Sequence, residues 1–161
     1  MDESIEHMPS GREQLQNLET EDKYVFHGSE NPELDSLEPH QAYNYIDNVQ
    51  EPDGDPAVFA SSKADYAIMM ALINNKNCPN GYHASASSSQ KETGETFLTL
   101  RASRDSVEQL NDKSFGYVYI FDKNLFQNKD GGVEYISKVP VSSVNKIRVT
   151  KSDLPPYIEV F

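Results

Sequence analysis

Hydrophobic and polar positions divide the chain into short apolar runs, rich in β-branched and aromatic residues, separated by segments rich in Pro, Gly, Asn and Ser. Runs of this kind predict β-strands bounded by turns. The predicted strands are residues 23–29, 56–60, 96–102 and 115–124, two strands within 133–150 separated by Pro140, and an edge segment in the tail 153–161. Gly131-Gly132 is expected to form a turn before the strand that contains Glu134.

The segment "SSKADYAIMMALINNKN" (61–77) has the period of a helix instead. Tyr66, Met70 and Ile73 fall on one face of it. Ser62, with Asp65 three residues later, resembles a capping pair at its start. We therefore predict a helix in this segment, after the strand at 56–60, and it is the clearest helix signal in the chain.

The remaining segments complete an α+β chain with one domain over residues 23–161. Short helices are predicted at 103–112, capped by Ser103, and after Pro39. Residues 77–95 are expected to form a polar loop. Residues 1–22 hold seven of the 26 acidic residues and one of the 14 basic ones, and are expected to form a flexible or weakly helical acidic leader.

Charge changes which partners we expect. The net charge of the 161 residues is −12, so a nucleic acid or an anionic lipid surface is disfavoured. No apolar run approaches the roughly 18 residues of a membrane span, and residues 1–22 lack the features of a secretory signal. Cys78 is the only cysteine, which agrees with a reducing compartment. A cytoplasmic location without membrane contact is expected.

Several kinds of chemistry lack the motifs they need. The four histidines are not spaced as metal ligands, so no metal site is predicted; they are His7, His27, His40 and His83. Neither of the common glycine-rich phosphate loops occurs, and no G-x-S-x-G elbow is present to carry a hydrolase nucleophile.

Three short stretches remain as candidates. A titratable ring, His27, ends an apolar strand and is followed by Gly28, a residue type that lets a ligand approach the backbone. The strand at 56–60 runs into a serine-rich helix start, and Glu134 opens a later strand. Taken alone, each has an ordinary structural explanation, such as a strand-end histidine or a solvent-facing glutamate.

Together and in this order, the stretches "FHGS", "PAVFASSKADYA" and "VEYISKVPVSSVNKIRV" resemble the ADP-ribosyltransferase fold, in the diphtheria-toxin-like branch that includes the poly(ADP-ribose) polymerases. That family has a strand ending H-G-[ST], a second reading like G-I-Y-F-A, and a glutamate opening a strand like E-Y-I-V-Y. The resemblance spans about residues 23–150. It implies a single α+β domain of split antiparallel and mixed sheets with a few helices.

The resemblance also implies a site for NAD as substrate, with no metal. Gly28 would hold the nicotinamide carboxamide through its backbone N–H and C=O. His27 would bond a ribose hydroxyl at the adenosine end, with Ser29 in support. Tyr66 would stack on the nicotinamide ring. Ser62 would reach the amide, with Ser61 as the alternative because the loop allows a shift of one residue.

Glu134 would be the central catalytic residue, with His27 as its partner. Its carboxylate would accept a hydrogen bond from the 2′-hydroxyl of the nicotinamide ribose and stabilise the positive charge that develops as the glycosidic bond breaks. It would also orient or deprotonate the acceptor.

Two positions depart from the family pattern. Val58 stands where the second strand has its tyrosine, so Phe59 is the candidate for the second face of a nicotinamide sandwich, without a hydroxyl. Relatives receive the pyrophosphate with a basic residue, and "LEPHQA" offers only His40 in that role. A helix-start role for His40 is the alternative.

The expected function is NAD-dependent mono-ADP-ribosylation of an unknown acceptor. The first alternative is an inactive module that binds NAD or ADP-ribose. An RNA 2′-phosphotransferase of the same fold is disfavoured, because such enzymes need several arginines around a phosphate and the chain has four arginines in all. An α+β interaction protein unrelated to this fold is the other alternative.

Overall fold

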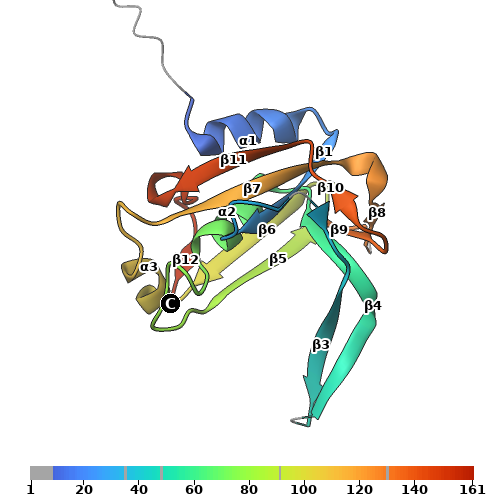
Figure 1. The fold of residues 1–161 in the computed structure, drawn as a ribbon, viewed down its shortest axis with the longest axis horizontal. Helices are drawn as coiled ribbons and strands as arrows, with labels where there is room; N and C mark the ends of the chain where they lie inside the picture. The colour runs from blue at the N-terminus through green and yellow to red at the C-terminus, as the bar shows by residue number, and fades with distance from the viewer. Residues whose placement is uncertain (1–8, 35, 48, 91, 130) are drawn as a thin grey trace, which may run out of the picture.

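Seven strands form the central sheet of the molecule, in the order β11-β7-β1-β4-β9-β8, with β3 paired to β4. The structure, a computed structural model, describes residues 9–34, 36–47, 49–90, 92–129 and 131–161 (Figure 1). Neighbouring strands of this sheet are antiparallel. The strands are β1 (Tyr24–Ser29), β3 (His40–Ile46), β4 (Val49–Ser61), β7 (Phe115–Asp122), β8 (Gln127–Asn128), β9 (Glu134–Ser137) and β11 (Asn145–Thr150).

Two smaller sheets and three α-helices complete the described part of the chain. One sheet pairs β5 (Ala84–Gln90) with β6 (Thr96–Ala102), and β6 in parallel with β12 (Glu159–Val160); the other pairs β2 (Ser36–Leu37) with β10 (Val141–Ser142). The helices are α1 (Gly11–Thr20), α2 (Ala64–Leu72) and α3 (Arg104–Glu108), with 3₁₀ turns at Lys123–Leu125 and Lys151–Asp153. The chain is thus a compact, mixed α+β domain of mostly antiparallel sheets.

Helix α2 lies at the centre of the larger hydrophobic core. It packs against β1 and β7 of the central sheet on one side, and its cluster includes Leu100 and Ala102 of β6 on the other. Seven of its nine residues are buried. The sequence "ADYAIMMAL" is apolar almost all round, which is the pattern of a helix enclosed on several sides.

Small residues bring α2 unusually close to the central sheet. A Cβ atom at Gly28 would lie 2.0 Å from the carbonyl oxygen of Ala67, and one at Gly116 would lie 1.9 Å from that of Ala71. Such approaches are far inside van der Waals contact, so only glycine fits at either strand position. Gly28 therefore has a packing role, whatever it binds.

The sequence suggested a flexible or weakly helical leader at residues 1–22. Residues 11–20 of it form a helix that is docked on the domain. The side chain of Leu15 on α1 is fully buried in the core around α2. Ser10 caps α1 by accepting a hydrogen bond from the backbone N–H of Glu13. Leu18, which is partly buried, packs against the same core. The acidic composition of the segment gave no signal of these two contacts. Residues 1–8 of the expected leader lie outside the described residues.

The start of α2 is capped differently from the sequence prediction. Lys63 is the N-cap residue and makes no side-chain cap, and the Ser62–Asp65 pair does not form one. Instead, the Glu19 carboxylate of α1 accepts a hydrogen bond of 2.7 Å from the Ala64 N–H. Asp65 receives two hydrogen bonds of 2.9 Å from Arg12 and one of 2.8 Å from the Tyr157 hydroxyl.

Two other local predictions are wrong, because strand pairing overrides weak local signals. The segment after Pro39 forms β3, which pairs with β4 to make an arm that projects from the body (Figure 1). The serine-rich part of the expected loop at 77–95 forms β5, paired with β6 from residue 84 to residue 90. The other predicted strands, the Ser103-capped helix and the edge segment of the tail are present.

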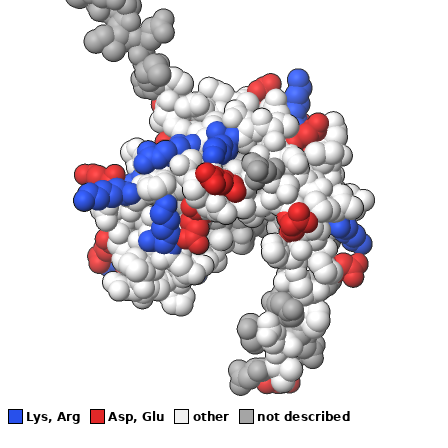
Figure 2. Space-filling model, viewed as in Figure 1, with Lys and Arg blue, Asp and Glu red and all other residues white. Residues whose placement is uncertain are grey.

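Cations gather at the β11 edge of the central sheet. Lys and Arg side chains lie among acidic ones on the face seen in Figure 2. The ring centroid of Phe115 lies 3.5 Å from Nζ of Lys76 and 4.6 Å from Cζ of Arg148. The ring centroid of Tyr117 lies 5.1 Å from Nζ of Lys146. Charges on an edge strand discourage pairing with another chain.

Candidate functional site

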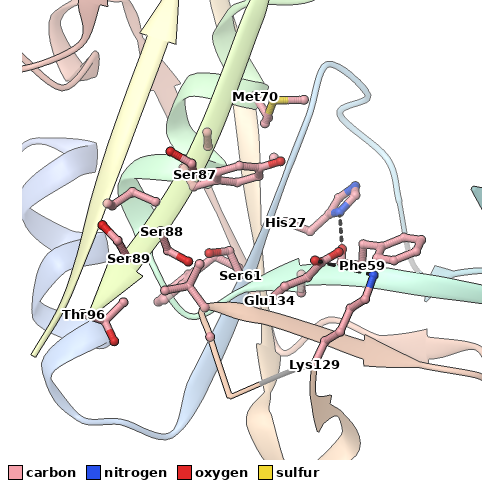
Figure 3. A pocket seen from close by; sticks show the side chains of 18 of the residues that line it. His27, Phe59, Ser61, Met70, Ser87, Ser88, Ser89, Thr96, Lys129 and Glu134 are labelled. Atoms are coloured by element: carbon pink, nitrogen blue, oxygen red, sulfur yellow. Dashed lines mark hydrogen bonds and ion pairs between the residues drawn. The ribbon is translucent and has the colours of Figure 1, made fainter. Parts of the chain in front are cut away.

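A cavity of about 870 Å³ opens between the central sheet and the β5–β6 sheet. Figure 3 shows its two walls: His27, Phe59 and Lys129 lie on one side and the hydroxyls of Ser87, Ser88, Ser89 and Thr96 on the other, with Ser61 and Glu134 between them. Ligand pockets commonly have volumes of about 300–1,000 Å³. Five of the sequence-predicted residues line the cavity; they are His27, Gly28, Phe59, Tyr66 and Glu134.

The sheet is split at this cavity. Among the described residues, β1 meets β4 in a single register pair, Phe26 with Ser61, and β4 continues across to β9 through Ser61 with Glu134. Residues directly opposite in an antiparallel pair share one face of a sheet. Phe26, Ser61 and Glu134 therefore project to the same face, towards α2 and the cavity.

His27 reaches the cavity because of the split. Alternation along β1 would turn its side chain to the opposite face from Phe26. Past the single β1–β4 pair, however, the ring lies in the gap between the strands, with Nδ1 2.9 Å from the carbonyl oxygen of Phe59. A carbonyl only accepts hydrogen bonds, so Nδ1 carries the proton and Nε2 of the neutral ring is left as an acceptor. β4 separates β1 from β9, but His27 and Glu134 line one cavity.

Burial is the main influence on the His27 ring. It lowers the pKa of the imidazole below its usual 6.5, partly offset by the hydrogen bond to Phe59, and His40 lowers it slightly further through charge repulsion. His27 is therefore neutral at pH 7. The Nε2 atom of a neutral ring in this tautomer is suited to accept a hydrogen bond from a ligand hydroxyl.

Gly28 presents backbone groups to the same gap. The Ser62 N–H donates to the carbonyl oxygen of Val133, which precedes β9 on the other side of β4 from β1. Because these groups alternate along a strand, Ser61 directs its own N–H and C=O towards Phe26 of β1. Alternate residues of a strand direct these groups to the same side. Gly28, two residues after Phe26, thus turns its N–H and C=O towards the gap, beyond the last β1–β4 register pair in the described residues.

Two aromatic rings contribute to the cavity from different elements. Phe59 shares the face of Ser61 on β4, whereas Val58 points to the opposite core with Val25 and Tyr119. The ring in this part of the cavity is therefore that of Phe59, without a hydroxyl. Tyr66 comes from the first turn of α2, where burial, and secondarily the charge of Glu134, raises the pKa of its hydroxyl.

Ser61, rather than Ser62, belongs to the cavity. Ser61 is 5% exposed and lines it, and its hydroxyl accepts a hydrogen bond from the Lys63 N–H. That hydroxyl keeps its own proton to donate. Ser62 is not among the lining residues. The one-residue ambiguity in the sequence is resolved by the β4 register, which turns alternate side chains away.

Ser29 and His40 are not brought to the cavity lining. The Ser29 hydroxyl accepts a hydrogen bond from the Asn31 N–H, in the turn after β1. His40 is exposed at the start of β3, opposite Ala57 of β4, so its suggested helix-start role is wrong.

Glu134 is the one carboxylate among the described residues of the cavity lining, and it is half-buried at the start of β9. Its backbone carbonyl accepts a hydrogen bond of 2.8 Å from the Lys129 N–H. The ammonium of Lys129 lies 3.9 Å from one of the carboxylate oxygens of Glu134 and 5.9 Å from the centroid of the Phe59 ring. Sequence reasoning missed Lys129, because a lysine before a turn carries no distinctive signal.

The β5–β6 wall was also missed. Ser87, Ser88 and Ser89 were assigned to a loop, but β5 brings them to the cavity together with Thr96 of β6. The nearest heavy atom to a Cβ built on Gly132 would be the Ser88 hydroxyl oxygen, at 3.6 Å, so the two walls approach each other at the 129–134 turn. This wall offers hydroxyl groups rather than charge.

No group of three or more His, Cys, Asp and Glu side chains in the described residues is arranged to hold a metal ion. No helix in the described part is long and apolar enough to cross a membrane.

Comparisons with family models, curated proteins and solved structures returned no significant match.

Proposed function

We propose that the cavity binds NAD and that the chain transfers the ADP-ribosyl group to an acceptor, on an ADP-ribosyltransferase-like fold. One observation carries this proposal: the Glu134 carboxylate shares a cavity with two aromatic rings and the open backbone edge at Gly28. A flat, positively charged ring that bears a carboxamide is complementary to these groups.

The nicotinamide end fits the groups around the split. The N–H and C=O of Gly28 would bond the carboxamide, and the hydroxyl of Ser61 would donate to its oxygen. Tyr66 and Phe59 would pack against the ring, and stacked or edge-on aromatic contacts of this kind contribute about 1 kcal/mol each. Nε2 of His27 would accept a hydrogen bond from a ribose hydroxyl.

The chemistry would centre on Glu134. As the bond between C1′ of the ribose and N1 of nicotinamide breaks, the bonding electron pair leaves with nicotinamide, which becomes neutral, and positive charge develops on the ribose. A carboxylate bonded to the 2′-hydroxyl stabilises that charge. The acceptor then forms the new bond to C1′, and its proton passes to Glu134 or to solvent.

A binding module without turnover is the second candidate. The Lys129 ammonium, 3.9 Å from Glu134, offsets the charge that catalysis would use, and Phe59 supplies no hydroxyl. The acceptor is unknown for the first candidate. We still predict that the chain does not bind nucleic acid and that it is cytoplasmic.

The test is to titrate NAD by calorimetry and to measure nicotinamide released from NAD in the presence of a broad acceptor mixture. NAD binding with nicotinamide release supports the transferase. NAD binding with no release supports the module. Absence of NAD binding contradicts both and favours an unrelated interaction protein.

A further inference from the structure

Lys129 occupies a defined position in the lining of the cavity. It directly follows β8, and its N–H bonds the carbonyl of Glu134, while its own carbonyl accepts from the Gly132 N–H. The Asn128 side chain also donates to the Gly132 carbonyl, at 2.8 Å. These bonds fix the backbone of the turn. In Figure 3 the Lys129 side chain extends from it towards Glu134 and Phe59.

The charges of the lining residues single out this lysine. Among the described residues that line the cavity, Lys129 is the one Lys or Arg and Glu134 the one carboxylate. The chain as a whole carries −12, which repels an anionic ligand at long range. Among the described lining residues, Lys129 is therefore the source of compensating charge for an anionic group bound here.

The Lys129–Glu134 pair is loose. The separation of 3.9 Å exceeds a hydrogen bond, and the two side chains are 38% and 47% exposed. Ion pairs as exposed as this contribute little. The lysine can pivot on its four-carbon stem and has three N–H donors. A better anionic partner would draw it away from Glu134 at small energetic cost.

We infer that Lys129 forms a phosphate subsite, which makes the cavity selective for phosphorylated nicotinamide glycosides and frees the Glu134 carboxylate when they bind. This inference rests on the proposed function, and it replaces His40 as the expected phosphate contact. Without a phosphate, the ammonium stays beside Glu134 and opposes the positive nicotinamide ring. The same side chain thus favours one ligand class and disfavours the other.

The test measures the Kd values of NAD, nicotinamide mononucleotide and nicotinamide riboside by calorimetry at low salt, for the wild type and Lys129→Met. The matched control is Lys138→Met, which removes an exposed lysine, paired with Asp55, from outside the cavity lining. Lys129→Met is expected to weaken binding of NAD and the mononucleotide by roughly tenfold to a hundredfold. Binding of the riboside should be unchanged or tighter, and Lys138→Met should change none of the three.

Equal weakening of all three ligands by Lys129→Met would overturn the inference, because it would indicate a structural role. Unchanged affinity for all three would overturn it as well. If only the riboside binds the wild type, the nicotinamide site stands and the phosphate subsite is refuted. If none of the three binds the wild type, the proposed function itself fails.

Discussion

The backbone of Gly28 lies against the carbonyl oxygen of Ala67 so closely that a Cβ on Gly28 would be 2.0 Å from it. The same glycine lies two residues beyond the single β1–β4 register pair and faces the gap of the split sheet. Gly28 thus serves two purposes: it lets α2 pack closely on the sheet, and it supplies open backbone groups to the cavity.

Gly28→Ala is expected to destabilise the fold, because the added methyl group would overlap backbone atoms of α2, which cannot move away by a change of rotamer. Overpacking of this kind lowers the free energy of unfolding by about 1–3 kcal/mol or more. Chemical denaturation measures it. Gly132→Ala is the control, since its Cβ would meet nothing closer than 3.6 Å, and it should change stability by less than about 1 kcal/mol. Equal stability of the two variants would contradict the close approach.

Glu134→Gln is expected to reduce nicotinamide release from NAD by about 10²-fold or more, because the amide carries no negative charge to stabilise the developing cation. The Kd for NAD should change little, since the amide keeps the shape and the hydrogen-bonding oxygen. Release would be followed by chromatography and binding by calorimetry. Full transfer activity in this variant would refute the role of Glu134.

Stability should depend on pH through His27. Its pKa is lowered in the folded state, so between the usual 6.5 and the folded value the unfolded chain binds the extra proton. The contribution is fully present above pH 6.5 and is lost as the pH falls through the folded pKa. His27→Asn keeps a donor for the Phe59 carbonyl but does not titrate. Urea denaturation from pH 7.5 to 4.5 should therefore show a steeper loss for the wild type, and parallel profiles would contradict the prediction.

The Arg12–Asp65–Tyr157 contacts should hold α1 and the tail against α2. Asp65→Asn removes the charged carboxylate to which the Arg12 guanidinium bonds, and the side chains of Arg12 and Asp65 are 25% and 12% exposed. We expect a loss of about 2 kcal/mol, below the value for full burial. Tyr157→Phe removes one hydrogen bond and should lose about 1 kcal/mol. Lys138→Ala, in an exposed pair, is the control and should change stability by less than about 0.5 kcal/mol in thermal or urea unfolding.

Local signals predicted the elements whose residues favour one structure on their own. The aromatic and β-branched run of β7 and the apolar "ADYAIMMAL" of α2 are examples. Their failures came where contacts outweighed propensity. β5 is rich in serine and becomes a strand because β6 pairs with it over its length. The segment of α1 was expected to be flexible or weakly helical, and its docking was not predicted, because Leu15 is its one fully buried side chain among mostly polar residues.

The amino-acid order alone determined that His27, Gly28, Phe59, Tyr66 and Glu134 occupy strand ends and a helix start, because strand and helix periods and turn residues are local properties. Only the tertiary structure decided that His27 enters the gap beside Phe59, that Ser61 rather than Ser62 lines the cavity, and that Lys129 stands beside Glu134. The reason is geometric: strand register and the single β1–β4 pair set which way each side chain points, and both arise from contacts between segments far apart in the chain.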